Sequence, residues 1–147
     1  MIRNILQLAL FFAMVQISAC KEDNDEPSAS DVKVDMLTAQ TWGQAIVTHA
    51  TDGDLSDQYP DFAITFTSNP SGGFQGTYVA ANGGHAFADA TGKWKFNDAL
   101  TLIVLDSGRE IEFELDETHL KLDFTVPVSG GRSNGLSGHF TFELQPL

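Results

Sequence analysis

The side chains that could hold a metal ion in this chain are widely spaced. Its four histidines, His49, His85, His119 and His139, lack the short spacing that metal ligands usually show. If the flanking segments are strands, alternation directs His119 and His139 outward. The pattern therefore favours four separate histidines over one shared metal site.

Two other groups resemble chemical motifs only in part. The segment Gly135-Leu136-Ser137-Gly138 is one residue short of the Gly-x-Ser-x-Gly elbow and lacks its strand-to-helix turn. Asp52, Asp54 and Asp57 gather carboxylates of the kind that Ca²⁺ favours, but without the EF-hand pattern, so a solvated loop is the preferred interpretation. We therefore expect no catalytic residue, no bound metal and no cofactor, and a protein that is not an enzyme.

The start of the chain has the three parts of an export signal. Arg3 supplies a positive charge, residues 5–15 form a short apolar run, and small residues precede Cys20. The run is shorter than the roughly 20 apolar residues that a membrane-spanning helix needs. Cys20 is the single cysteine, so it has no partner for a disulfide within the chain. We expect residues 1–19 to be a cleaved signal peptide.

The residues around Cys20 resemble two bacterial signals. Ile17-Ser18-Ala19-Cys20 resembles a lipobox, which implies that the Cys20 thiol carries diacylglycerol and that the freed amine carries a further fatty acid such as palmitate. At about 0.8 kcal/mol per buried CH₂, two chains suffice for stable membrane attachment. Lys21-Glu22-Asp23 resembles the surface-export signal of Bacteroidetes lipoproteins, which implies the outer face of the outer membrane. A solvated acidic spacer is the alternative.

The charge balance limits the partners of the remaining chain. The formal net charge is -12, and residues 1–19 contain one basic and no acidic residue. Such an acidic surface repels nucleic-acid phosphates and anionic headgroups, so we expect no nucleic-acid partner and membrane contact only through the lipid. Residues 20–34 contain too little apolar surface to fold and are expected to form an extended, disordered acidic tether. Residues 35–147 are expected to form one β domain.

From Trp42 onward, apolar residues alternate with period two between turn residues, as is typical of all-β domains. Four strands are expected at residues 42–49, 62–67, 74–80 and 136–144, and four more between residues 94 and 126. Short connections favour an antiparallel meander, and closure would remove the exposed edges of an open sheet. The expected fold is an eight-stranded antiparallel up-and-down barrel.

Turn residues predict the registers of the central hairpins. With Asp116-Glu117 as a two-residue loop, Phe113 lies opposite Leu120 and Glu112 opposite Lys121. The loops Ser107-Gly108 and Asn97-Asp98-Ala99 predict the neighbouring registers in the same way. Together these registers direct the following side chains inward: Trp94, Phe96, Leu100, Leu102, Val104, Ile111 and Phe113.

Several short motifs resemble one family along most of this domain. Trp42-Gly43 opens the first strand, and Gly130-Gly131-Arg132 precedes Phe140-Thr141-Phe142. With the paired strands between them, these motifs resemble the lipocalin-like lipoproteins of Bacteroidetes over residues 37–144. The resemblance implies a lipocalin-like barrel that holds a small apolar ligand.

Aromatic residues are the candidates for contact with such a ligand, because the chain has eleven Phe, two Trp and two Tyr. The predicted ligand-binding residues are Phe62, Phe66, Trp94, Phe113, Phe124 and Phe142. An eight-stranded barrel is also narrow enough for these rings to fill it, which is the alternative. Tyr59, Phe74 and Phe87, in or beside long loops, are expected to contact a partner or to pack as ordinary loop residues.

These features predict a lipid-anchored, surface-exposed domain of the bacterial outer membrane that binds a small apolar ligand and is not catalytic. Two alternatives stay open: a β module that binds glycan or protein through its loops, and a structural component of the envelope. A solvent-reachable interior cavity would favour the apolar ligand. A filled barrel would move function to the loops.

Overall fold

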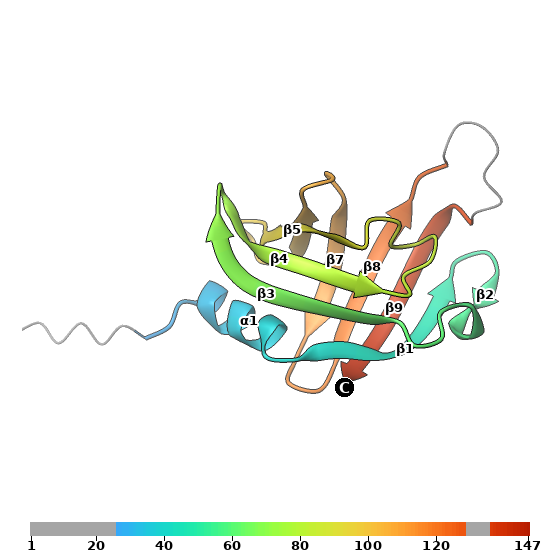
Figure 1. Ribbon diagram of the computed structural model, residues 1–147, viewed down its shortest axis with the longest axis horizontal. Coiled ribbons are helices and arrows are strands. Elements are labelled where there is room, and N and C mark those ends of the chain that lie inside the picture. The colour runs from blue at the N-terminus through green and yellow to red at the C-terminus, as the bar shows by residue number, and fades with distance from the viewer. Residues whose placement is uncertain (1–25, 129–135) are drawn as a thin grey trace, which may run out of the picture.

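The computed structural model describes residues 26–128 and 136–147 (Figure 1). The predicted signal peptide, Cys20, the Lys21-Glu22-Asp23 segment and the Gly130-Gly131-Arg132 motif lie outside the described residues.

The described chain folds into a closed antiparallel barrel. Its elements are α1 (Ala29–Thr38), β1 (Thr41–His49), β2 (Gly53–Asp54), η1 (Ser56–Gln58), β3 (Ala63–Ser71), β4 (Phe74–Ala81), β5 (Thr91–Phe96), β6 (Leu102–Leu105), β7 (Glu110–Leu115), β8 (Leu120–Val126) and β9 (Gly138–Pro146). β3 to β9 pair in chain order, and β1 pairs with both β3 and β9, which closes the sheet. The eight-stranded up-and-down barrel predicted from the sequence is confirmed, with the two-residue β2 added beside β1.

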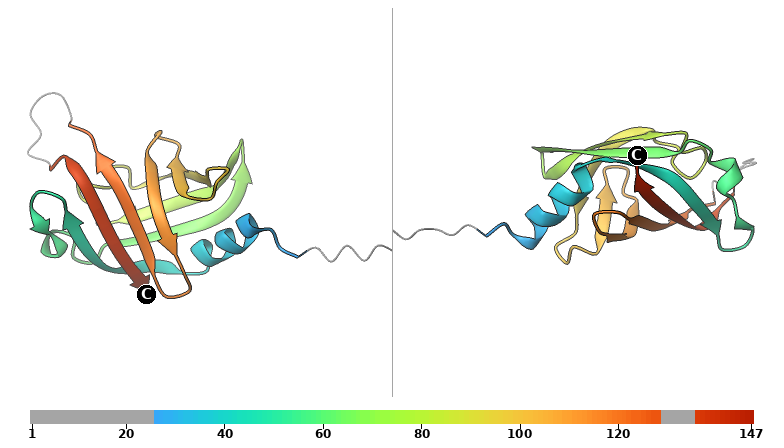
Figure 2. Two further views of the ribbon diagram at one scale, coloured as in Figure 1. Left: turned by 180° about the vertical axis from the view of Figure 1, so that it is seen from behind. Right: turned by 90° about the horizontal axis from the view of Figure 1, so that it is seen from below.

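The tether expected to extend to residue 34 is helical from Ala29, so this expectation is wrong over its last residues. Ser28 begins α1 with a capping box, in which its hydroxyl accepts the Asp31 N–H and its own N–H donates to the Asp31 carboxylate. Leu37 is fully buried, and the Trp42 indole donates to its carbonyl at 3.0 Å. The helix lies against one end of the barrel (Figure 2). Contact with the barrel stabilises the helix, and the few apolar residues of the helix did not predict this contact.

The β7–β8 hairpin is shifted by two residues from the expected register. Phe113 lies opposite Leu122 and Glu114 opposite Lys121, so the predicted pair of Glu112 with Lys121 is wrong. The Asp116 carboxylate accepts both the N–H and the hydroxyl of Thr118, which holds residues 116–119 in a longer loop. Because side chains alternate with period two, a two-residue shift leaves the predicted inward face unchanged.

β6 is shifted from the expected register by three residues against β5 and by one residue against β7, and either odd shift reverses its faces. Ile103 and Leu105 are buried, whereas Leu102 and Val104 are only half-buried, so their predicted inward position is wrong. Ile103 lies opposite both Phe96 and Ile111. The Asn97 side-chain oxygen accepts the N–H groups of residues 101 and 102, and this lengthens the loop that the sequence indicated.

The predicted inward faces of β3 and β9 line the interior of the barrel. Phe62 and Ile64, before and within β3, are buried, as are Phe140 and Phe142 of β9. The segment with η1 and the segment between β4 and β5 lie at the end of the barrel away from α1 (Figure 1). Their buried side chains, Leu55, Tyr59, Ala86 and Phe87, join the same core.

Two pairs of neighbouring strands separate along their length. β1 pairs with β3 only through Thr41–Thr65 and Trp42–Ile64, whereas it pairs with β9 from Trp42 to His49, with a bulge between Gly43 and Ile46. β7 pairs with β8 only over residues 112–115 and 120–123, although β8 continues along β9 to Val126. We call these two separations the β1–β3 fork and the β7–β8 fork.

Candidate functional site

The six predicted ligand-binding residues are packed against other rings in the barrel. Ring centroids lie 5.7 Å apart for Phe66 and Trp94, 5.0 Å for Phe62 and Phe142, and 5.6 Å for Phe124 and Phe142. Phe113 stacks on Phe96 at 5.0 Å. Their exposed fractions do not exceed 8%. The structure therefore brings these residues together as core, and their rings occupy the space predicted for a ligand.

Of the three aromatic residues expected in or beside long loops, Tyr59 and Phe87 are packed into the core, and Phe74 is not. Tyr59 meets Phe142 edge-on at 5.1 Å, and Phe87 meets Phe124 at 5.0 Å, and both loop residues are buried. Phe74 is half-buried, with the Lys95 ammonium 5.7 Å from its ring centroid. Tyr59 and Phe87 thus close the barrel instead of presenting an aromatic face to a partner.

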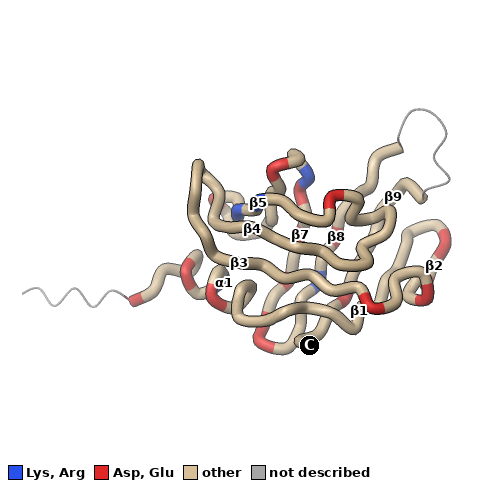
Figure 3. Tube along the Cα trace, in the orientation of Figure 1, with Lys and Arg blue, Asp and Glu red and all other residues tan. Residues whose placement is uncertain are grey.

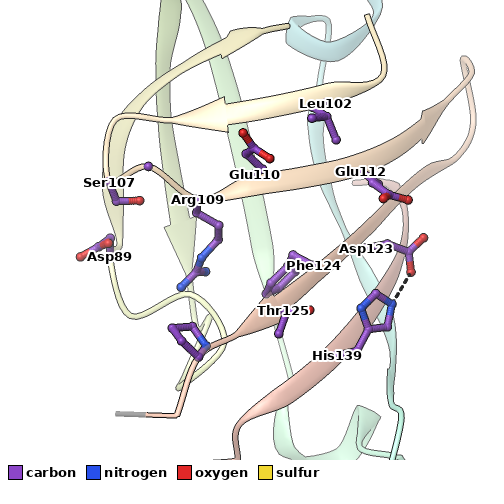
Figure 4. Close-up of a pocket in the computed structure, with 12 residues that line it drawn as sticks. Asp89, Leu102, Ser107, Arg109, Glu110, Glu112, Asp123, Phe124, Thr125 and His139 are labelled. Atoms are coloured by element: carbon purple, nitrogen blue, oxygen red, sulfur yellow. Dashed lines mark ion pairs between the residues drawn. The ribbon is translucent and has the colours of Figure 1, made fainter. Parts of the chain in front are cut away.

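A cleft of about 640 Å³ lies at the β7–β8 fork (Figure 4). Glu110 of β7 and Thr125 of β8 line its two sides, and Phe124 and Arg109 lie toward the barrel interior. Its volume is within the range of about 300–1,000 Å³ that small-ligand sites have. This cleft, and not the barrel interior, is the concave surface that the two strands create.

The Arg109 side chain fills the space behind the fork. Its guanidinium lies 5.3 Å from the Phe124 ring centroid and 5.8 Å from that of Phe87, within the range of cation–π contact. It also donates to the Ala86 carbonyl, so it ties β7 to the segment between β4 and β5. Arg109 therefore packs on the Phe87 and Phe124 rings on the interior side of the fork.

Carboxylates surround the cleft, in keeping with the excess of acidic residues over the barrel (Figure 3). Glu110, Glu112, Asp123 and Asp89 are among its lining residues. Neither Glu110 nor Glu112 forms an ion pair with a side chain in the described ranges. Arg109 is held at the inner side, so the outer part of the cleft is negatively charged.

Asp123 is the carboxylate with the most partners at this rim. Burial raises the pKa of Asp123, but the Thr141 hydroxyl and the Lys121 ammonium outweigh burial and hold that pKa below its usual value. Lys121 contacts Asp123 and Glu114 at 3.0 Å each, and hydrogen bonds to these carboxylates raise the Lys121 pKa. His139 lies 3.6 Å from Asp123 (Figure 4).

The acidic loop and the histidines have separate local partners. His49 is buried, with Nδ1 2.6 Å from the Asp52 carboxylate and Nε2 3.2 Å from the Ser137 carbonyl. The Asp54 carboxylate accepts hydrogen bonds from the Ser56 N–H and hydroxyl, which lowers the Asp54 pKa. Within residues 26–128 and 136–147, no three His, Cys, Asp or Glu side chains gather as metal ligands.

The cleft was not predicted from the sequence, although one signal for Arg109 was present. Ile111 and Phe113 were both placed inward, and the same alternation puts Arg109 on the inward face of β7. A cation on an otherwise apolar face indicates a special site. The separation of β7 from β8 has no comparable local signal, and the Phe87 ring that Arg109 packs on comes from a distant segment.

No protein-family model matches the chain, and no curated protein matches it. Among the described residues, no helix has the length and apolar character needed to cross a membrane.

Proposed function

We propose that this protein is a lipoprotein anchored through Cys20 on the outer face of the bacterial outer membrane, and that its barrel is a non-catalytic binding module. In this proposal the ligand occupies the β7–β8 cleft, on the outside of the barrel. The observation that carries it is the contrast between the ring-packed interior and the acidic cleft of about 640 Å³ beside it.

A cleft between two strands suits binding without catalysis. Its charged side chains are four carboxylates and Arg109, with Ser107, Thr125 and His139 as further polar lining residues. The Arg109 guanidinium is engaged with two rings and the Ala86 carbonyl, and His139 lies beside Asp123. Carboxylates in a concave acidic surface attract a cationic group of a ligand. We therefore propose a positively charged ligand.

A crosslinking experiment in cells tests the location. A photoreactive amino acid at Thr125, in the cleft, should form a discrete adduct in intact cells. The matched control is Thr48, an exposed threonine on the outer face of β1. Adducts from Thr48 and not from Thr125 would contradict the proposed site.

The small apolar ligand in the interior is the second candidate, favoured by the closed lipocalin-like barrel and its apolar rings. Trp94 is fully buried among these rings and reports on the interior. With a fatty acid as probe, our proposal predicts no saturable change in Trp94 emission and no rise in melting temperature. A saturable change that Trp94→Phe removes would place the ligand inside the barrel instead.

The proposed lipid anchor is based on the lipobox-like residues before Cys20, and mass spectrometry tests it. The wild-type mature protein should carry acyl chains at Cys20, and Cys20→Ala should abolish them, since the chain has no other thiol. Acyl chains that persist in this variant would rule out the proposed anchor.

The surface location is proposed on Lys21-Glu22-Asp23 and tested by protease added to intact cells. Wild type should be digested, and replacement of these three residues by alanine should protect the domain. If intact cells protect the wild-type protein while opened cells do not, the anchor faces the periplasm.

A further inference from the structure

Backbone hydrogen-bonding groups face each other across the β7–β8 fork. In an antiparallel ladder, the N–H and C=O of successive residues point alternately to the two neighbouring strands. The Leu105 N–H donates to the Arg109 carbonyl, so Arg109 bonds toward β6 and the next residue, Glu110, is directed toward β8. The Ala50 N–H donates to the His139 carbonyl, so His139 bonds toward β1.

The same alternation settles the orientation of Thr125. Because His139 bonds toward β1, its opposite residue on β8, Thr125, directs its own N–H and C=O toward β7. The last pair that the two strands form is Glu112 with Asp123. Continuing this register would pair Glu110 with Thr125, and within the described chain that row is missing. Two N–H and two C=O groups therefore face the cleft.

We propose that the β7–β8 fork binds an extended peptide segment with a basic side chain, which completes the missing row of the barrel wall. The inference rests on the proposed binding role of the cleft and names its ligand class. Unpaired strand edges are templates for another strand, because they offer N–H and C=O groups at the spacing of a polypeptide. An inserted strand would bond to Glu110 on one side and to Thr125 on the other.

Charge complementarity argues for the basic residue. Glu110, Glu112 and Thr125 lie on the outer faces of their strands and are exposed. Alternate side chains of the inserted segment would point to the same outer face, where the carboxylates of Glu110 and Glu112 form no described ion pair. A lysine or arginine there would gain two acidic neighbours. The opposite side chains would meet Phe124 and the Arg109 stem, which suits apolar residues.

The test uses the mature lipoprotein in detergent micelles and the capped peptide acetyl-Val-Lys-Val-Lys-Val-amide. We expect saturable shifts of the backbone amide NMR signals of Glu110 and Thr125, with binding that weakens as salt is added. Replacing both lysines of the peptide by glutamate should weaken binding at least tenfold. Methylating the backbone nitrogens of the peptide should abolish the shifts, because it removes the donors that pair with the strands.

Matched variants separate the cleft from the overall charge. Glu112→Lys should weaken peptide binding at least tenfold. Glu117→Lys makes the same charge change in the loop at the other end of the hairpin, outside the cleft, and should leave binding unchanged. Thr125→Pro removes one N–H of the proposed site and should abolish binding with little change in melting temperature.

Four results would overturn the inference. They are peptide shifts absent from Glu110 and Thr125, equal binding of the N-methylated peptide, equal binding of the glutamate peptide, and equal weakening by Glu112→Lys and Glu117→Lys. If such a result coincides with a crosslink from Thr125 in cells, the cleft binds another kind of ligand and the proposed function stands. If that crosslink is also absent, both fail.

Discussion

The two forks of the barrel wall differ in how their backbone groups are satisfied. At the β1–β3 fork, the segment after β1 folds back along the separated strand. The Leu55 N–H donates to the Val47 carbonyl at 2.8 Å, and the Val47 N–H donates to the Ser56 hydroxyl at 3.0 Å. At the β7–β8 fork, Arg109 and the Phe87 ring pack from the interior side, and within residues 26–128 and 136–147 no segment pairs with the separated strand backbones.

The comparison shows that separation of two strands does not by itself create a binding site. Unpaired backbone groups need a partner, and a nearby segment of the same chain supplies one at the first fork. At the second fork the groups of Glu110 and Thr125 face a cleft of about 640 Å³. An external strand is the partner that matches these groups, which is why the two forks are expected to respond differently to substitution.

The largest expected effect is at the filled fork. Tyr59→Ala removes a buried ring that meets Phe140 and Phe142, and we expect a loss of about 3 to 5 kcal/mol in the free energy of unfolding. Thr125→Ala at the open fork should change it by no more than about 0.5 kcal/mol. Denaturant unfolding of the two variants measures both. A loss for Thr125→Ala as large as that for Tyr59→Ala would mean that the Thr125 side chain is packed and does not border an open cleft.

A smaller effect is expected for the side chain behind the open fork. Arg109→Ala removes the cation–π contacts with Phe87 and Phe124 and the bond to the Ala86 carbonyl, for an expected loss of about 1 to 3 kcal/mol. Arg109→Lys should recover only part of it, because an ammonium lacks the planar face of the guanidinium. Unchanged stability of Arg109→Ala in thermal and denaturant melts would show that Arg109 does not hold the fork.

The free energy of unfolding is expected to depend on pH through Asp123, which belongs to the last β7–β8 pair beside the fork. Its folded pKa is lowered, so its interactions stabilise the fold above the unfolded pKa of about 3.9 and lose that effect as pH falls through the folded value. Asp123→Asn should therefore be less stable than wild type at pH 7, and the difference should shrink as the pH falls below the unfolded pKa and through the lowered folded pKa. Urea unfolding across this range is the measurement. A difference independent of pH would rule out the ionised carboxylate as its source.

The smallest expected change in stability, that of Glu114→Ala, tests the register in which β7 pairs with β8. Glu114 forms an exposed ion pair with Lys121, so Glu114→Ala should cost about 0 to 1 kcal/mol, measured by denaturant unfolding. A double-mutant cycle with Lys121→Ala should show coupling for Glu114 and none for Glu112. Coupling at Glu112 in place of Glu114 would restore the two-residue loop that the sequence indicated.

The barrel could be predicted because alternation and turn spacing act locally and repeat along the chain. Inward faces such as Phe62 and Phe66, or Phe140 and Phe142, follow from period two alone. Loop lengths were harder to predict from the sequence, because they depend on hydrogen bonds from side chains to the backbone of the same loop. Asn97 and Asp116 each lengthen a loop in this way, which reversed β6 in one case and only shifted β8 in the other.

Features that depend on distant contacts could not be predicted. α1 has one buried residue, Leu37, whose environment is the end of the barrel and not the helix itself. The six predicted ligand-binding residues were placed inward correctly, but alternation does not tell whether facing rings meet or leave a space. Arg109 could have been identified by its place in the alternation. Its partner ring Phe87 could not, because the sequence placed that residue only in a long loop.

Amide hydrogen exchange in the free protein tests the open fork most directly. An open fork predicts rapid exchange of the Glu110 and Thr125 N–H groups and slow exchange of their neighbours in the closed ladder, Glu112 and Asp123. The Val47 N–H, which Ser56 caps at the other fork, should also exchange slowly. Equal protection of all five amides would mean that the backbone row between Glu110 and Thr125 is formed and that the fork is closed.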